Sequence, residues 1–130
     1  MTGTKGTGNG EERVLSLLGL VRRAGGVAAG ADRTLAAVRT NATEIAAVLV
    51  ASDASARTSK QITDKCAFYG VRCVKLGADS SVLAERMGLR SSCAAAAVLK
   101  RGPWKPLCDA LGGDEQYRNK PTVNTIVWIF

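Results

Sequence analysis

The sequence predicts an α/β fold in which a largely parallel or mixed sheet lies between layers of helices. Apolar residues recur at helical spacing in some segments, and short uninterrupted apolar runs occupy others. The two kinds of segment alternate over about a hundred residues, which is typical of sheets covered by helices. Hydrophobic residues make up 46% and charged residues 22% of the 130 residues, which is ordinary for one globular domain.

The first expected element is an amphipathic helix that follows a flexible arm. Residues 1–10 are mostly Gly and Thr, so we expect residues 1–11 to form the arm. Apolar side chains then stand at i, i+3, i+4 and i+7, and two cations followed by two glycines end the helix. The apolar residues are Val14, Leu17, Leu18 and Val21, and the closing segment is Arg22–Gly26.

A short strand, a helix, a buried strand and another helix are expected next. Residues 27–29 predict the short strand, and residues 32–39 predict the helix after it. The unbroken apolar run 45–51 predicts a strand that is covered on both faces. Thr58–Gln61 fits a capping box that opens the second helix. The inner face of that helix is expected to comprise Ile62, Cys66 and Tyr69, and Gly70 is expected to end it.

The remaining elements complete the alternation of strands and helices. Residues 71–76 predict a strand, and Asp79 or Ser80 is expected to cap a short helix after it. Residues 93–99 predict a strand of mostly small side chains, and Pro103 is expected to start the last helix. The apolar face of the last helix consists of Trp104, Leu107, Cys108 and Leu111.

The segment after the last expected helix differs in composition from the rest. We expect residues 12–111 to form the domain and residues 112–130 to be a linker with an apolar tail. Residues 122–130 are strongly β-prone and end in Trp-Ile-Phe. This tail could add an edge strand, contact another molecule, or stay an exposed apolar end.

The charge balance favours a polyanionic partner. Lys and Arg number 18 against 11 Asp and Glu, which gives a net charge of +7 without any His. Nucleic acid is a better candidate than a membrane, because no basic amphipathic surface helix stands out; a plain soluble basic domain is the alternative. Because the sequence has neither an apolar run long enough to span a membrane nor an apolar N-terminal segment, we expect a cytoplasmic protein.

The sequence offers little support for catalysis, a metal or a cofactor. Its four cysteines have no Cys-x-x-Cys spacing and no His partner, so we expect buried reduced thiols. Neither a P-loop motif nor a strand-GxGxxG-helix unit occurs. Asp53 and Asp64 could form an acid–base pair, but a turn and a helix surface are their expected places. The cysteines are Cys66, Cys73, Cys93 and Cys108.

Two segments are candidates for contact with a polyanion. The segment Arg22–Thr34 combines paired arginines with Gly30, which stands just before an expected helix N-terminus that suits a phosphate. A plain connection between elements is the alternative for this segment. The loop Gly88–Ser92 exposes a cation, Arg90, and its Leu89 could point outward or pack inward.

Four runs resemble one protein family in order and without large gaps. They are LLGLVRRAGGVAAGADRTLAAV, AAVLVASDAS, TSKQITDKCAFYGVRCVKLG and LAERMGLRSSCAAAAVL. They resemble the superfamily of ribosomal proteins that bind kink-turn RNA (the seven-Ae and thirty-e types), and its small bacterial YlxQ-like branch in particular. The resemblance spans about residues 12–111. It implies a three-layer α/β/α sandwich with a mixed, about four-stranded sheet.

The resemblance also implies where RNA binds. In that family the RNA surface comprises the loop and helix start after the first strand and a loop before the last strand, which correspond to residues 30–34 and 89–92. The family motif Gly-x-Asn-Glu-x-Thr-Lys falls on residues 30–36, where Gly30 matches and Asn, Glu, Thr and Lys are replaced by Asp32, Arg33, Leu35 and Ala36. The family's Asn and Glu contact sheared G·A pairs, whereas Arg33 is suited to a guanine edge or a phosphate.

The sequence therefore predicts a non-enzymatic RNA-binding protein, associated with ribosomal or other structured RNA. A protein-interaction module on the same fold, without RNA binding, is the alternative, and the apolar tail would suit self-association or a protein partner. The residues expected at the RNA are Arg22, Arg23, Gly30, Ala31, Asp32, Arg33, Thr34, Leu89, Arg90 and Ser91.

Overall fold

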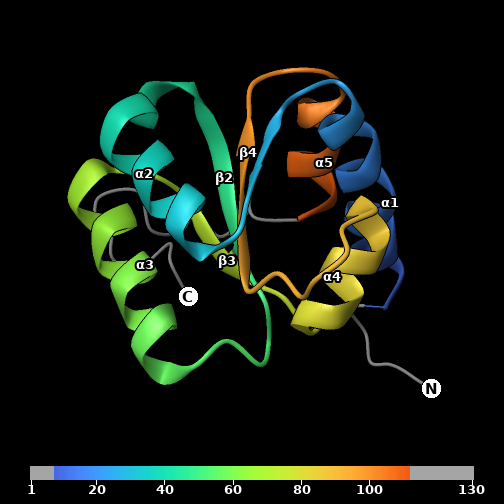
Figure 1. Cartoon of the computed structure of the whole chain (residues 1–130). Coiled ribbons are helices and arrows are strands. Elements are labelled where there is room, and N and C mark those ends of the chain that lie inside the picture. The colour runs from blue at the N-terminus through green and yellow to red at the C-terminus, as the bar shows by residue number, and fades with distance from the viewer. Residues whose placement is uncertain (1–7, 112–130) are drawn as a thin grey trace.

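The computed structural model describes residues 8–111, with side chains from residue 11 onward, as a three-layer α/β/α sandwich (Figure 1). A mixed four-stranded sheet lies in the middle, in the order β1-β4-β2-β3. β2 and β3 run parallel, whereas β4 runs antiparallel to both β1 and β2. The strands are β1 (Val27–Ala29), β2 (Ile45–Val50), β3 (Cys73–Lys75) and β4 (Ala95–Leu99). The predicted fold class is confirmed.

The helices form two layers, one on each face of the sheet. One layer contains α2 and α3, and the other contains α1, α4 and α5 (Figure 1). A single 3₁₀ turn, Ala42–Glu44, leads from α2 into β2. The helices are α1 (Gly8–Arg23), α2 (Ala31–Asn41), α3 (Ala56–Tyr69), α4 (Ser80–Met87) and α5 (Trp104–Ala110).

Two apolar clusters fill the space between the layers, one on each face of the sheet. Along β2, Leu49 belongs to the cluster under α1, α4 and α5, whereas Val48 and Val50 belong to the cluster under α2 and α3. This alternation explains the unbroken apolar run, because each face of the strand is covered by helices. Three of the four cysteines are buried and Cys108 is half-buried, and all four are free thiols.

The predictions for the two ends of the chain can be compared with the structure only in part. The first helix begins at Gly8, inside the segment expected to be a flexible arm over residues 1–11. Residues 1–7 and the predicted linker and tail at residues 112–130 lie outside the described residues. None of the helices between residues 8 and 111 is long and apolar enough to cross a membrane.

The start and the inner face of α3 differ from the expectation. The helix begins at Ala56, and the Oγ atom of Ser55 caps it by accepting a hydrogen bond from the backbone N–H of Thr58 at 3.1 Å. Thr58 therefore stands in the first turn and does not open the helix. Tyr69, expected on the inner face, is 38% exposed, whereas Ile62 and Cys66 are fully buried as expected.

Asp53 fastens the turn after β2 to the start of α4. Its carboxylate accepts hydrogen bonds from the backbone N–H of Ser80 at 2.8 Å and from the Ser80 hydroxyl at 2.9 Å. Asp64, the other carboxylate considered for catalysis, forms an ion pair with Lys60 at 2.9 Å on the exposed side of α3. Asp53 therefore lies in a turn and Asp64 on a helix surface, as expected.

We expect the contact of Asp53 to make stability depend on pH. The hydrogen bonds from Ser80, first from its N–H and then from its hydroxyl, lower the pKa of the Asp53 carboxyl from the ordinary 3.8. A lowered pKa in the folded state stabilises the protein above the ordinary value, and this stabilisation is lost as the pH falls through the folded value. The Tm advantage of the wild type over Asp53→Ala should therefore be full near pH 7 and shrink as the pH falls below 3.8. An advantage that persists unchanged at acid pH, measured by circular dichroism, would contradict this.

Candidate nucleic-acid interface

A hollow of about 300 Å³ brings together the two segments that the sequence singles out. Its walls come from the end of α1, the connection from β1 to α2, and the loop from α4 to β4. Six of the ten expected site residues line it: Arg22, Gly30, Arg33, Leu89, Arg90 and Ser91. We call this site the arginine hollow. Its other lining residues are Val27, Ala29, Ser92 and Cys93.

The backbone of Gly30 sets the geometry at the start of α2. Its φ of 105° and ψ of 150° fall in a region that only glycine adopts readily. Its N–H donates to the carbonyl of Ala95 at 2.8 Å, and its carbonyl accepts from the N–H of Thr34 at 2.9 Å. No side chain caps this helix start. The first N–H groups of α2 are therefore available to an anionic group beside the hollow.

The loop from α4 to β4 is held at both of its ends. Gly88 ends α4 in the left-handed conformation, and the N–H of Leu89 donates to the carbonyl of Ala84 at 2.8 Å. At the other end Cys93 is buried, and its Sγ donates to the carbonyl of Ala95 at 3.1 Å. Burial raises the pKa of the Cys93 thiol, so it remains protonated and serves as an anchor. Arg90 is exposed between these two anchors.

The structure shows the direction of the Leu89 side chain, which the sequence leaves open. Its side chain is half-buried and packs against the apolar cluster under α1, α4 and α5. The same residue lines the arginine hollow, so it contacts the core and offers an apolar edge to a ligand.

The arginine hollow is electropositive. Arg22, Arg33 and Arg90 line it, and no carboxylate is among its lining residues. The ion pairs found between residues 11 and 111 are Lys60–Asp64 and Arg86–Glu12, and neither involves these three arginines. A guanidinium stays protonated at every physiological pH, so the three charges are permanent. The hollow thus suits a phosphate, or a base edge that accepts two hydrogen bonds.

Four of the expected site residues lie outside the arginine hollow. Thr34 requires a correction: its side chain is fully buried and its hydroxyl hydrogen-bonds the carbonyl of Ala28 at 3.4 Å, so it faces the interior. Ala31 is half-buried and packs against the cluster under α2 and α3. Arg23 is exposed on α1, beside the hollow wall that Arg22 forms. Asp32 lines a different hollow.

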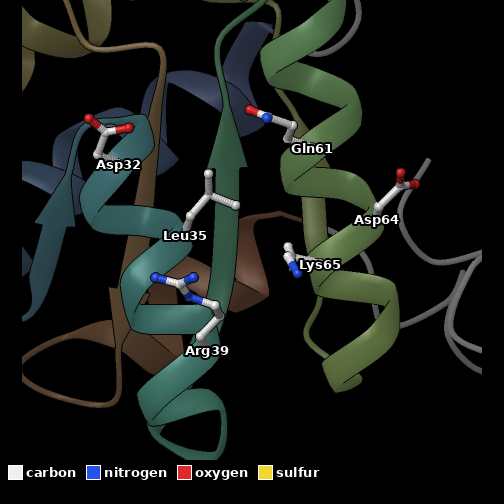
Figure 2. A pocket seen from close by; sticks show the side chains of 6 residues that line it. All are labelled: Asp32, Leu35, Arg39, Gln61, Asp64 and Lys65. Carbon is white, nitrogen blue, oxygen red and sulfur yellow. The ribbon is translucent and has the colours of Figure 1, made fainter.

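That second hollow lies between α2 and α3 and has a volume of about 620 Å³ (Figure 2). It was not anticipated from the sequence, because it depends on how the two helices pack. Its residues nevertheless repeat at helical spacing on each helix, which is the only signal the sequence holds. They are Asp32, Leu35 and Arg39 on α2, and Gln61, Asp64 and Lys65 on α3.

Val27, Ala29, Ser92 and Cys93 complete the arginine hollow. Ser92 lies in the segment 89–92 that the resemblance assigns to the RNA surface, whereas the other three were not expected at the site. Val27 and Ala29 stand two apart on β1 and share one face of the strand, a period that could have identified them. Cys93 could not have been identified, because its place beside the hollow depends on the loop. Within residues 11–111 no group of three or more His, Cys, Asp or Glu side chains is arranged to hold a metal ion.

The chain is similar in sequence to two proteins that bear the name RNA-binding protein YlxQ. The RNA-binding protein YlxQ of Enterococcus faecium is 35% identical over 71 residues, which cover 55% of this chain and 67% of that protein. The RNA-binding protein YlxQ of Bacillus subtilis (strain 168) is 42% identical over 55 residues, which cover 42% of this chain. The match spans only 53% of the B. subtilis protein.

Two solved structures share the fold. A protein of unknown function from Bacillus halodurans C superposes with a TM-score of 0.67 at 28% identity, covering 77% of this chain and 97% of that one. The Giardia lamblia 15.5kD RNA binding protein superposes with a TM-score of 0.64 at 22% identity, covering 81% of this chain and 89% of that one. At that identity the second match supports the fold alone.

Most of the described residues match one protein family. Residues 12–107 match the ribosomal protein L7Ae/L30e/S12e/Gadd45 family. This range contains all four runs that resemble the family in the sequence. Both segments that line the arginine hollow lie within this range. The chain therefore belongs to the ribosomal protein L7Ae/L30e/S12e/Gadd45 family.

Proposed function

We propose that this protein is a non-enzymatic, cytoplasmic RNA-binding protein that holds a structured, kink-turn-like RNA, ribosomal or other, in the arginine hollow. The observation that carries the proposal is the convergence of three arginines, from three separate segments, on one hollow without a carboxylate. An uncapped helix start beside them adds N–H donors for a phosphate. Two relatives bear the name RNA-binding protein, which supports RNA as the polyanion.

Each part of the hollow has a distinct role in this proposal. Arg33, at the start of α2, contacts a guanine edge or a phosphate, and Arg22 flanks it from α1. Leu89 packs against an unstacked base, and Arg90 binds the adjacent phosphate. Ser91 and Ser92 add hydroxyl groups at the rim of the hollow. Structured RNA is commonly bound in this way, through its shape, its backbone and its splayed bases.

A titration with matched RNAs tests the proposal. We expect purified protein to bind a kink-turn RNA more tightly than a same-length RNA that lacks the sheared G·A pairs. Each titration is repeated at several KCl concentrations, because phosphate contacts make the affinity fall with salt. Equal and steeply salt-dependent binding to both RNAs would retain RNA binding and reject the kink-turn. Absence of binding to both would contradict the kink-turn proposal and favour a protein-interaction module.

A further inference from the structure

The hollow between α2 and α3 carries two cations that the arginine hollow does not use. Arg39 stands on α2 and Lys65 on α3, so they come from opposite walls (Figure 2). Both are exposed, and neither takes part in the ion pairs found between residues 11 and 111. Leu35 and Gln61 point into the space between the helices, where they provide an apolar floor and an amide.

The two carboxylates of this hollow lie away from its cationic centre. The carboxylate of Asp64 points to the far side of α3 (Figure 2) and is already bound to Lys60 at 2.9 Å. Asp32 stands two turns from Arg39 along α2, at the end of the hollow nearest the start of that helix. The stretch that Arg39 and Lys65 flank is therefore electropositive and suited to a chain of phosphates.

An exposed aromatic ring stands on α3 one turn beyond Lys65. Phe68 follows Lys65 by three residues, so the two side chains are neighbours on the surface of α3, although Phe68 itself is not among the residues that line the hollow. Its side chain is 78% exposed, an unusual position for phenylalanine. It meets the Tyr69 ring edge to face, with ring centroids 4.9 Å apart, which supports the ring and leaves it accessible.

Cations that flank a groove, followed by an exposed aromatic ring, are the elements by which proteins bind single-stranded nucleic acid. We propose that the hollow between α2 and α3, together with Phe68, binds a single-stranded segment that flanks the structured RNA. Arg39 and Lys65 bind its phosphates, and a base stacks on Phe68. This inference rests on the proposed function, since it assumes that the structured part occupies the arginine hollow.

The two hollows are placed for one continuous RNA. Arg33 lines the arginine hollow and its neighbour Asp32 lines the hollow between α2 and α3, so the first turn of α2 separates the two sites. An RNA strand that leaves the arginine hollow over this turn passes Asp32 and then reaches the stretch between Arg39 and Lys65. The scarcity of apolar surface favours RNA over an acidic protein segment here, because Leu35 is the one apolar residue among those that line the hollow.

The test measures the affinity that a single-stranded tail adds. The full chain is titrated, by fluorescence anisotropy, with a kink-turn hairpin and with the same hairpin carrying a tail of about eight uridines at its 5′ or 3′ end. We expect one tail position to raise the affinity of the wild type about tenfold. Arg39→Ala/Lys65→Ala and Phe68→Ala should each reduce this gain to less than about threefold and leave binding of the untailed hairpin unchanged.

A matched control removes two cations on the other face of the sheet. Arg13 on α1 and Lys105 on α5 are exposed and line neither hollow, so Arg13→Ala/Lys105→Ala should keep the full tail gain. Thermal melts confirm that each variant folds. Because the untailed hairpin reports the arginine hollow alone, failure of the wild type to bind it would contradict the proposed function and, with it, this inference. Equal affinity of the wild type for tailed and untailed hairpins would contradict this inference alone.

Three results would overturn the inference. They are the absence of a tail gain at either end in the wild type, a gain that survives in both test variants, and an equal loss of affinity for tailed and untailed RNA. The first result is the one expected if a protein segment occupies the hollow. In that case an acidic peptide, titrated separately, should bind and should lose affinity in Arg39→Ala/Lys65→Ala.

Discussion

The double variant Arg33→Ala/Arg90→Ala is expected to bind kink-turn RNA about thirty- to a thousandfold more weakly than the wild type. Each arginine that contacts a base edge or a phosphate contributes on the order of 1–2 kcal/mol to binding. The two side chains come from different segments that line one hollow, so their contributions should largely add. The measurement is an equilibrium titration of untailed kink-turn RNA by each protein.

Salt dependence separates the two roles proposed for these arginines. Loss of a phosphate contact should lower the slope of log affinity against log salt by about one, whereas loss of a base-edge contact should leave the slope almost unchanged. Arg90→Ala should therefore lower the slope, and Arg33→Lys should reveal whether the forked geometry of Arg33 matters. The control is Arg13→Ala/Lys105→Ala, which removes two exposed cations outside the hollow. Affinity of the Arg33→Ala/Arg90→Ala protein equal to that of the control would remove both arginines from the RNA site.

Substitution of Gly30 is expected to have the largest effect on the architecture of the site. Gly30 has a φ of 105° and a ψ of 150°, where any L side chain is strained, although a Cβ there would meet no atom within 4 Å. We expect Gly30→Asn to lower the free energy of unfolding by about 1–3 kcal/mol. The start of α2 should move as well, which weakens RNA binding through Arg33.

Gly88 provides the matched control for that substitution. It also has a positive φ, 75°, but its ψ of 27° places it in the left-handed helical region that asparagine tolerates. A Cβ at Gly88 likewise meets nothing within 4 Å, so the two sites differ in backbone conformation and not in space. Gly88→Asn should therefore cost less than about 1 kcal/mol in a urea melt. An equal loss of stability in the two variants would contradict the assigned role of Gly30.

Much of the fold could be predicted from the sequence because its signals are local. The helical repeat of Val14 and Leu18 and the apolar run in β2 depend on neighbouring residues, and both predictions are confirmed. The start of α3 was wrong because two capping patterns overlap: Ser55 is the true cap, whereas Thr58 resembles one. Tyr69 has the period of the inner face, but it is the last residue of α3 before the Gly70 cap, where it is 38% exposed and meets the Phe68 ring.

Part of the candidate site was also predictable, because it lies in short segments that carry a local sequence signal. Resemblance to the family placed Gly30 and Leu89 at the RNA, and the structure brings both to one hollow. That Arg22 joins them depends on the packing of α1 against the sheet, and its paired charge was the only local signal. Thr34 was misassigned because the first turn of α2 rotates its side chain into the core. Arg39 and Lys65 stand on two different helices, so no local pattern reveals that they line the same hollow.

The central claim is that RNA occupies the arginine hollow, and NMR titration of isotope-labelled protein with untailed kink-turn RNA tests it most directly. Backbone signals of Gly30, Arg33, Leu89 and Arg90 should shift progressively as RNA is added. Signals of Lys105 on α5 should stay in place, because this residue lies outside the hollow. Shifts confined to residues outside the hollow, with the signals of Gly30 and Arg90 unmoved at saturation, would contradict the account.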